Sequence, residues 1–274
     1  MGTGLWTRGD SKDYDAWADM VGDESWNWNS FLPYFRKTEH HFSPLDDFSS
    51  KVHGQDGPVH TAAVISSGRH YPLREPVKAA WAALGIHQAA DINDGSQLGL
   101  AEIVEARTKG QRVIASAAYP LDGVTVLHST LVKRVLVSTL PDDTKVATGI
   151  ELISGKRISA KSEVILSAGA IRIPQLLMLS GIGPTDELRR HGIEQIVESP
   201  HVGKNLWDHL SLPQQWTLRY PELGASFGSP PFKDPAFMNG NPLDWQTTFS
   251  VDTAELKDAL SHDSGIQIRR KTHF

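Results

Sequence analysis

The most regular hydrophobic pattern in the chain lies in its middle third. Residues 124–137 alternate between apolar and polar side chains and are rich in β-branched residues, which predicts a strand. Residues 139–145 are polar and predict a turn, and residues 146–153 and 162–167 predict two more strands. The pattern therefore predicts an antiparallel ribbon followed by a buried strand.

The stretch VILSAGAIRIPQLLMLSGIGP at 164–184 has few polar side chains and many small ones. It predicts a strand that passes through Ala168, Gly169 and Ala170 into an apolar helix. Two interpretations are open. The segment is either an ordinary core crossover or a place where bare main chain approaches a large flat ligand, with the N–H groups of the helix start facing an anion.

The remaining pattern predicts shorter elements. In chain order they are a helix at 11–21 capped by Ser11, a helix at 30–39 with Pro33 in its first turn, a glycine-rich turn and strand at 52–63, a helix at 74–84 that stops at Gly85, a short helix at 185–191 capped by Thr185, and a strand at 192–198. Residues 221–243 are rich in proline and glycine without periodicity, which predicts a long loop or a poorly ordered tail.

Composition narrows the classes of protein. The chain has 274 residues, enough for about two domains or one large one, and its 39% apolar and 22% charged residues are ordinary for a globular protein. The net charge of −5 comes without a basic patch, which argues against nucleic acid as a partner. No apolar run is long enough for a transmembrane helix, and the N-terminus MGTGLWTRGD lacks the apolar core of a signal peptide, so the compartment stays open.

Neither cysteine, nor histidine, nor the GxSxG match identifies a catalytic or metal site. The absence of cysteine excludes disulfides, thiolate nucleophiles and cysteine metal sites. The 12 histidines show no HExxH or comparable spacing, so no metal site is expected, and His40 and His41 are expected to be solvent-exposed. The GxSxG at 224–228 matches a hydrolase nucleophile elbow, but flanking prolines exclude the helix that such an elbow needs.

The 164–184 stretch also carries a longer pattern of fixed positions. They are Gly169, Ala170, Pro174, Leu176, Leu177, Ser180, Gly181, Ile182 and Gly183. In this spacing the stretch resembles the second signature of the glucose–methanol–choline (GMC) family of FAD-dependent oxidoreductases. One position departs, because Ile173 stands where the family has Ser or Thr.

Further blocks resemble the same family, in the family's order. They are WTRG at 6–9 with DYDAW at 13–17, Trp28 with LPYF at 32–35 and Glu39, GQDGP at 54–58, DINDG at 91–95, GQR at 110–112 with SAAY at 116–119, and VGKNLWDH at 202–209. The resemblance covers about residues 4–212. Fungal aryl-alcohol-type and glucose-oxidase-like members are the most similar in character.

The resemblance implies an α/β fold. It consists of a partial FAD-binding domain, Rossmann-like and of GMC type, with an antiparallel β-ribbon, plus part of an α+β substrate domain. Residues 1–60 and 106–212 are expected in the FAD-binding domain, and residues 61–105 and 213–274 in the substrate domain, with the last piece incomplete or disordered.

The resemblance also implies contacts with the nucleotide part of FAD. The main chain of Val132 is expected at the adenine, and Ala168 and Gly169 are expected to line the nucleotide. The plainer alternative for Val132 is an ordinary strand valine that touches no ligand.

The flavin end of FAD is expected to meet two other segments. Asn205 and Asp208 are expected near this end of the pocket, with His209 ordering a loop beside it, and Trp6 and Thr7 are expected to cover the isoalloxazine. The plainer alternatives are an Asx turn at Asn205 and Asp208, and an edge tryptophan packed on the core.

By resemblance, the chain is an FAD-dependent oxidoreductase that acts on the CH–OH group of a small-molecule alcohol, with hydride transfer to the flavin. The family's GxGxxG and catalytic histidine are not among the matched blocks, so no catalytic residue is assigned and a chain truncated at both ends is expected. The alternative is a non-catalytic remnant that does not bind FAD by itself. The alcohol, the electron acceptor (oxygen or a quinone) and the oligomeric state stay open.

Overall fold

The computed structural model describes residues 4–43, 51–69, 71–208, 213–225, 229 and 243–250. The chain forms two compact units. Unit 1 comprises Met1–Asp122 with Trp216–Phe274, and unit 2 comprises Gly123–Gln215. Among the described residues, no helix is both long enough and apolar enough to cross a membrane. The predicted loop at 221–243 lies mostly outside the described residues.

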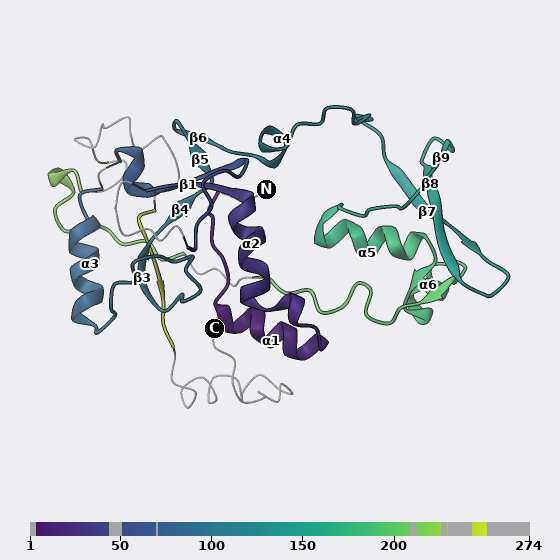
Figure 1. Ribbon diagram of the computed structural model, residues 1–274, viewed down its shortest axis with the longest axis horizontal. Coiled ribbons are helices and arrows are strands. Elements are labelled where there is room, and N and C mark those ends of the chain that lie inside the picture. The colour runs from purple at the N-terminus through teal and green to yellow at the C-terminus, as the bar shows by residue number, and fades with distance from the viewer. Residues whose placement is uncertain are drawn as a thin grey trace. The chain divides into compact units, whose positions relative to one another are not determined.

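Unit 1 carries most of the helices (Figure 1). They are α1 (Ser11–Val21), η1 (Glu24–Trp26), α2 (Trp28–Thr38), η2 (Val64–Ser67), α3 (Arg74–Ala83), α4 (Ala115–Ala118) and η3 (Pro221–Leu223). The helix predicted at 11–21 is confirmed as α1, but the predicted cap Ser11 is wrong, because Asp10 occupies the cap position and its side chain accepts a hydrogen bond from Lys12 N. Helix α2 begins earlier than predicted, because Asn27 caps it, and Pro33 therefore lies beyond the first turn.

The strands of unit 1 form three small sheets. They are β1 (Glu39–Phe42), β2 (Val59–Ala63), β3 (Gly99–Glu102), β4 (Val104–Glu105), β5 (Arg107–Thr108), β6 (Gln111–Arg112) and β12 (Trp245–Thr248). Strand β2 lies between parallel β1 and antiparallel β4, β3 pairs with β12, and β5 and β6 form a hairpin. Buried Ile92, Ala101 and Val104 form the core cluster beside these sheets.

The GQDGP turn at 54–58 packs directly against the end of α2. A β-carbon at Gly54 would overlap the carbonyl oxygen of Arg36, and one at Gly57 would overlap the backbone of Glu39. Only glycine leaves room for this contact, which brings the turn and β2 alongside β1.

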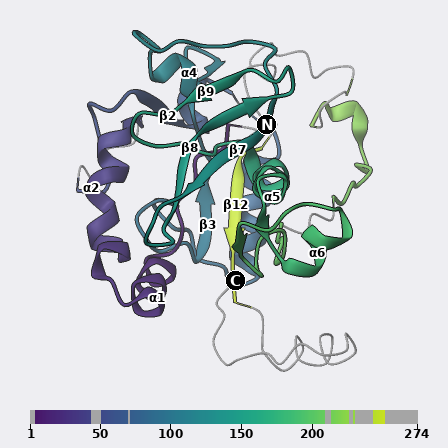
Figure 2. The same cartoon turned by 90° about the vertical axis from the view of Figure 1, so that its right-hand side faces the viewer.

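Unit 2 contains the predicted antiparallel ribbon (Figure 2). Its elements are β7 (Val132–Thr139), β8 (Lys145–Leu152), β9 (Arg157–Ser159), α5 (Gly169–Leu179), β10 (Ile182–Gly183), α6 (Thr185–Arg190) and β11 (Val197–Glu198). The sheet order is β7-β8-β9, and α5 packs against β7. The ribbon and the apolar helix are therefore confirmed.

Several predicted bounds in unit 2 are wrong. The strand predicted at 124–137 begins only at Val132, and the third strand is β9 rather than 162–167. Within the described part of the chain no strand pairs with 162–167, and Ile165 is 75% exposed. Apolar periodicity indicates which residues can be buried, but a ladder also needs a neighbouring strand.

Two predictions for the last part of unit 2 are wrong: the cap of α6 and the bounds of the strand that follows it. Thr185 does not cap α6, because Pro184 occupies the cap position and the Thr185 hydroxyl donates instead to Glu198 Oε1 at 2.9 Å. The strand predicted at 192–198 is formed only by its last two residues, which pair with β10.

Candidate functional site

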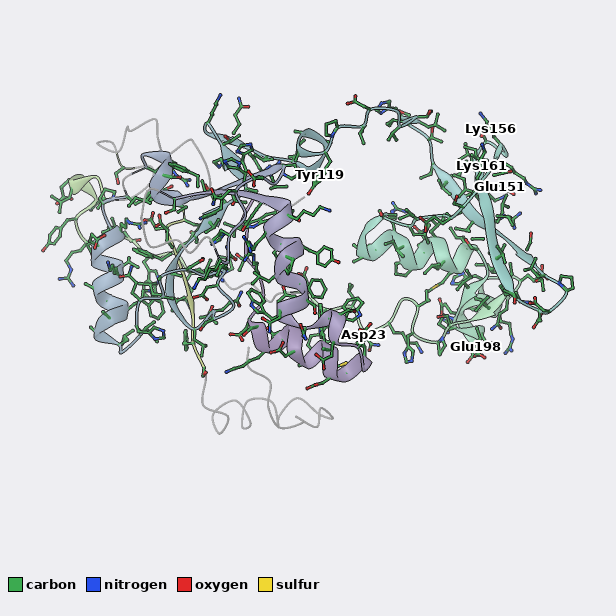
Figure 3. The ribbon with its side chains drawn as sticks, in the orientation of Figure 1. Asp23, Tyr119, Glu151, Lys156, Lys161 and Glu198 are labelled. Carbon is green, nitrogen blue, oxygen red and sulfur yellow. The ribbon has the colours of Figure 1, made fainter. Side chains whose placement is uncertain are left out.

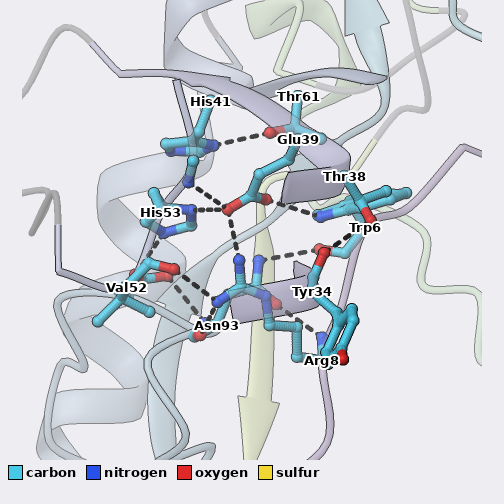
Figure 4. A network of polar contacts seen from close by, with 12 residues as sticks. Trp6, Arg8, Tyr34, Thr38, Glu39, His41, Val52, His53, Thr61 and Asn93 are labelled. Atoms are coloured by element: carbon cyan, nitrogen blue, oxygen red, sulfur yellow. Dashed lines mark hydrogen bonds and ion pairs between the residues drawn. The ribbon is translucent and has the colours of Figure 1, made fainter. Parts of the chain in front are cut away.

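A network of buried charged groups surrounds Glu39 in unit 1 (Figure 4). Glu39 is completely buried at the start of β1, and its carboxylate accepts a hydrogen bond from the Arg8 guanidinium. The same carboxylate accepts from Trp6 Nε1 at 3.0 Å and from Gly54 N at 3.1 Å, and it lies 2.9 Å from His53 Nδ1. Four partners from two short segments, residues 6–8 and 53–54, thus converge on one side chain.

His53 lies between two carboxylates. Its Nε2 is 2.7 Å from Asp91 Oδ2, while its Nδ1 faces Glu39. Burial lowers the pKa of His53, but the hydrogen bonds to Asp91 and Glu39 outweigh burial and raise its pKa above the ordinary value. Burial raises the pKa of both carboxyls, and the hydrogen bonds from His53 outweigh it, so both pKa values lie below their ordinary values. The two carboxylates therefore favour the protonated, cationic form of His53.

His41 corrects the expectation of a solvent-exposed histidine. It is 3% exposed, because Glu39 and His41 share the inward face of β1 while His40 points the other way. Its ring stacks on His53 at 3.9 Å, and its Nδ1 lies 2.9 Å from Thr61 Oγ1. Burial and the positive charge of His53 lower the pKa of His41 to about 4, so this ring is neutral at pH 7.

The ligand atoms of Glu39, His41 and His53 lie within 4.8 Å of one another, close enough to suggest a metal site. The chemistry of this donor set does not fit a cation. Both ring nitrogens of His53 face carboxylates, and the Arg8 guanidinium already contacts Glu39. The group is an ion-pair network, and sequence spacing missed it because its members come from β1 and from turns far apart in the chain.

The network fixes the main chain of the predicted flavin-covering segment. Arg8 N donates to Asn93 Oδ1 at 2.7 Å, Asn93 Nδ2 donates to Trp6 O at 3.1 Å, and Trp6 N donates to Val104 O at 2.8 Å. The Trp6 ring packs against the core cluster, whereas Thr7 is exposed. A cavity of about 250 Å³ adjoins Trp6, Thr7 and Arg8. Trp6 thus packs on the core, as expected for the alternative of an edge tryptophan. Its contact with flavin stays a prediction.

In unit 2, Val132 begins β7 opposite Leu152 and is half-buried. The β7–β8 register shifts between Val132 and Arg134. A bulge interrupts the ladder and can turn main-chain groups away from the neighbouring strand. Such a position is suited to main-chain recognition of a ligand.

The surroundings of Val132 are strongly charged. Glu151 lies on β8 (Figure 3). Its carboxylate is 2.9 Å from Lys133 Nζ, 3.0 Å from Arg134 and 3.4 Å from Arg157. The hydrogen bonds from Lys133 and Arg134 lower the pKa of Glu151 to about 2. Three cations therefore share one carboxylate, a feature that strand periodicity did not predict.

Ala168 and Gly169 form an open bend at the start of α5. Both are exposed, and Gly169 has φ +83°, a left-handed conformation that glycine adopts readily. A β-carbon at Gly169 would meet no atom within 4 Å, and no side chain caps the helix. Bare main chain at a helix N-terminus fits the phosphates and adenosine of a dinucleotide, so these residues fit FAD.

Helix α5 is tied to the ribbon by one buried side chain. Ser180 Oγ accepts a hydrogen bond from Val135 N at 2.8 Å and donates to Leu176 O at 2.6 Å. Val132 and Gly169 therefore belong to two elements, β7 and α5, that pack against each other within one unit.

The last predicted contacts lie in the block after β11. Asn205 has φ +56° and Asp208 is exposed, while His209 lies outside the described residues. A β-carbon at Gly203 would overlap Met178, so this block packs against α5. Five of the seven predicted FAD contacts thus lie in unit 2 and two in unit 1, and contact of all seven with FAD stays a prediction.

Comparisons with known proteins agree with the resemblance. A family profile described as GMC oxidoreductase matches residues 1–211. The chain is 42% identical over 260 residues to the GMC-type oxidoreductase acuG of Aspergillus aculeatus, covering 95% of this chain and 45% of that protein. It is 33% identical over 221 residues to an oxygen-dependent choline dehydrogenase of Staphylococcus aureus, covering 79% and 38%. A variant of formate oxidase from Aspergillus oryzae, described for the effect of a mutation on FAD modification, matches with a TM-score of 0.72 at 27% identity, covering 96% and 49%. The chain spans less than half of each of these proteins.

Proposed function

This chain belongs to the GMC oxidoreductase family, and from that membership we propose that it forms part of an FAD-dependent oxidoreductase acting on the CH–OH group of a small alcohol. FAD is the cofactor of the family. The observation that carries the proposal is the open main chain at Ala168 and Gly169, within the segment that bears the family's second signature and packs on β7.

The proposed roles of the residues are binding and orientation. Ala168 and Gly169 offer main-chain N–H groups to the nucleotide, and Val132 offers main-chain groups beside a bulge to the adenine. Asn205 and Asp208 face the flavin end, and the buried network holds Trp6 and Thr7 in place. The bound flavin supplies a hydride acceptor. No base is assigned to a residue of this chain.

Titration of the purified chain with FAD tests the proposal, with flavin fluorescence as the readout. Gly169→Ala is expected to weaken FAD binding at least about tenfold, because its β-carbon occupies the space left for the nucleotide. Gly155→Ala is the matched control, since Gly155 has the same φ of +83° and also no atom within 4 Å of an added β-carbon. Equal effects of the two substitutions on FAD affinity contradict the proposed contact.

The second candidate is a chain that does not bind FAD by itself. It is favoured by the exposure of apolar side chains on the same segment, because Ile165 is 75% and Ile171 is 78% exposed. Failure of the unmodified chain to bind FAD in the same titration supports this second candidate and rejects autonomous cofactor binding.

A further inference from the structure

A cavity of about 550 Å³ lies on the other face of the β1–β2 pair from the buried network. Its walls come from β1, β2, η2 and the β5–β6 hairpin, all within unit 1. Because side chains alternate along a strand, His41 and Thr61 turn into the network, whereas His40 and His60 take the opposite face. Thr61 borders both the network and the cavity, but the charged residues that line the cavity, Glu105, Arg107 and Lys109, are not among the groups around Glu39.

Of the two cationic residues that line this cavity, Arg107 is the more buried. Glu105 lies 2.6 Å from Arg69 NH2 and 3.3 Å from Arg107 Nε, so one buried carboxylate is shared by two guanidinium groups. The Arg107 side chain is only 14% exposed, and its NH1 donates a hydrogen bond to Gly110 O at 2.9 Å. Among the described residues, its Nε makes the ion-pair contact with Glu105 but no hydrogen bond of good geometry. A largely buried cation that shares its counter-ion favours an anion beside it, because desolvated charge is costly without compensation.

A second cation stands at the turn of the β5–β6 hairpin. The two turn residues, Lys109 and Gly110, have φ of +47° and +74°, as in a type I′ turn. Asparagine, aspartate and glycine are favoured there, and lysine adopts this conformation with strain. Turn geometry therefore does not account for Lys109, an exposed residue that lines the cavity.

Two imidazole rings complete the donor set. His40 and His60 are paired in register on β1 and β2, and their rings stack at 4.7 Å. An imidazole ring offers at least one N–H donor. Since the whole chain has a net charge of −5, the positive character of this cavity is local and does not follow from composition.

We propose that this cavity binds a small oxyanion, a carboxylate or a phosphate, through Arg107 and Lys109, with His40 and His60 as further donors. The Arg107 guanidinium offers a charged donor to an oxyanion, and an ammonium group adds a point charge. The site is separate from the proposed FAD contacts and does not depend on them.

Calorimetric titration of the full chain with sodium phosphate and with sodium acetate, at constant ionic strength set by chloride, tests this site. Saturable binding of either anion is expected, with a dissociation constant of about 1 mM or lower. Phosphate binding without acetate binding assigns the site to phosphate groups, and the reverse result assigns it to carboxylates.

Lys109→Asn separates binding from folding. Asparagine suits the left-handed turn position, so the variant is expected to be at least as stable as the unmodified chain while binding the anion at least about tenfold more weakly. Lys12→Asn removes the same charge from the exposed surface of α1 in the same unit, and its anion affinity is expected to be unchanged. Absence of saturable binding, or equal weakening by the two substitutions, overturns the proposal.

Discussion

Glu39 is the side chain on which the buried polar part of unit 1 depends. Its carboxylate meets Arg8, Trp6, His53 and Gly54, and it is fully removed from water. Buried cations are tolerated only when anions compensate them, so Arg8 and His53 require this carboxylate. Arg8 also donates to Asn93 O, and the Asn93 side chain donates to Trp6 O. The buried network therefore helps to position the segment that is predicted to cover the flavin.

Replacement of Glu39 by glutamine keeps the shape but removes the charge. We expect Glu39→Gln to lower the free energy of unfolding by about 3–5 kcal/mol, because two buried cations lose their shared anion. Urea unfolding followed by tryptophan fluorescence measures the change. Glu75→Gln is the control, because Glu75 is 74% exposed, and its effect is expected to stay within about 0.5 kcal/mol. Similar losses in both variants contradict the role of Glu39.

The depressed pKa of His41 predicts a dependence of stability on pH. The folded chain resists protonation of His41 until about pH 4, whereas the unfolded chain takes up this proton near pH 6.5. The unfolded state therefore binds more protons in this window, and the contribution of His41 to stability is lost as the pH falls from about 6.5 to about 4. The raised pKa of His53 has the opposite sign, because its contribution to stability is fully present below about pH 6.5 and is lost as the pH rises through its folded pKa. His53 is present in both proteins that are compared below, so the comparison isolates His41.

The measurement compares unfolding free energies of the unmodified chain and His41→Asn at pH 7 and pH 5. The unmodified chain is expected to lose more stability than the variant on acidification. NMR titration of the His41 ring in the unmodified chain provides a check that needs no substitution, and a His41 pKa near 6.5 rejects the prediction.

At the scale of elements, close backbone contacts decide how β1, β2 and α2 meet. The GQDGP turn fits only because Gly54 and Gly57 lack side chains where they touch the main chain of Arg36 and Glu39. The contact continues into the parallel β1–β2 pair, where Glu39 lies opposite Val59. The two glycines thus help to align the strands that carry Glu39 and His41.

Gly57→Ala tests this contact. Its β-carbon overlaps the Glu39 backbone, which cannot move as a side chain can, and we expect a loss of about 3 kcal/mol in the free energy of unfolding. Gly22→Ala is the comparison, because Gly22 has φ +71° but open space around it, and its loss is expected to be about 1 kcal/mol. Thermal and urea unfolding measure both, and a smaller effect at Gly57 than at Gly22 contradicts the packing argument.

At the scale of the whole molecule, the buried apolar side chains are divided unequally between the units. Among the described residues, the large buried hydrophobic side chains of unit 2 are Val135, Leu152 and Leu188, whereas those of unit 1 are Trp28, Val59, Val64, Ile92, Leu100, Ile103 and Val104. Apolar burial is the main favourable term in folding. Unit 2 is therefore expected to open more readily than unit 1.

Hydrogen exchange followed by mass spectrometry measures this difference. Strands β2 and β8 are a matched pair, because each is the central strand of a three-stranded sheet. We expect amides of β2 to exchange at least about tenfold more slowly than those of β8, which corresponds to about 1.4 kcal/mol in opening free energy. Faster exchange in β2 contradicts the unequal distribution of stability.

Local signals in the sequence predicted much of the fold. The turn at 139–145 and the alternation around it predicted β7 and β8, and the apolar run after Gly169 predicted α5. The predictions were wrong where two local signals competed, as at Asp10 and Ser11, and where a strand needed a partner, as at 162–167. A helix cap forms with the side chain that lies within hydrogen-bond distance of the free backbone N–H groups, and a strand forms only beside another strand. Apolar periodicity contains neither kind of information.

The sequence by itself determined the family, through fixed blocks in a fixed order, and it determined the elements that local periodicity specifies. Only the tertiary structure decided that Glu39, His41, His53 and Asp91 share one buried network, and that Arg107 and Lys109 line a cavity. The physical reason is that periodicity reports the burial of a residue relative to its own element. Charge pairing is instead set by distances between elements, and these arise only when the strands and turns have packed together.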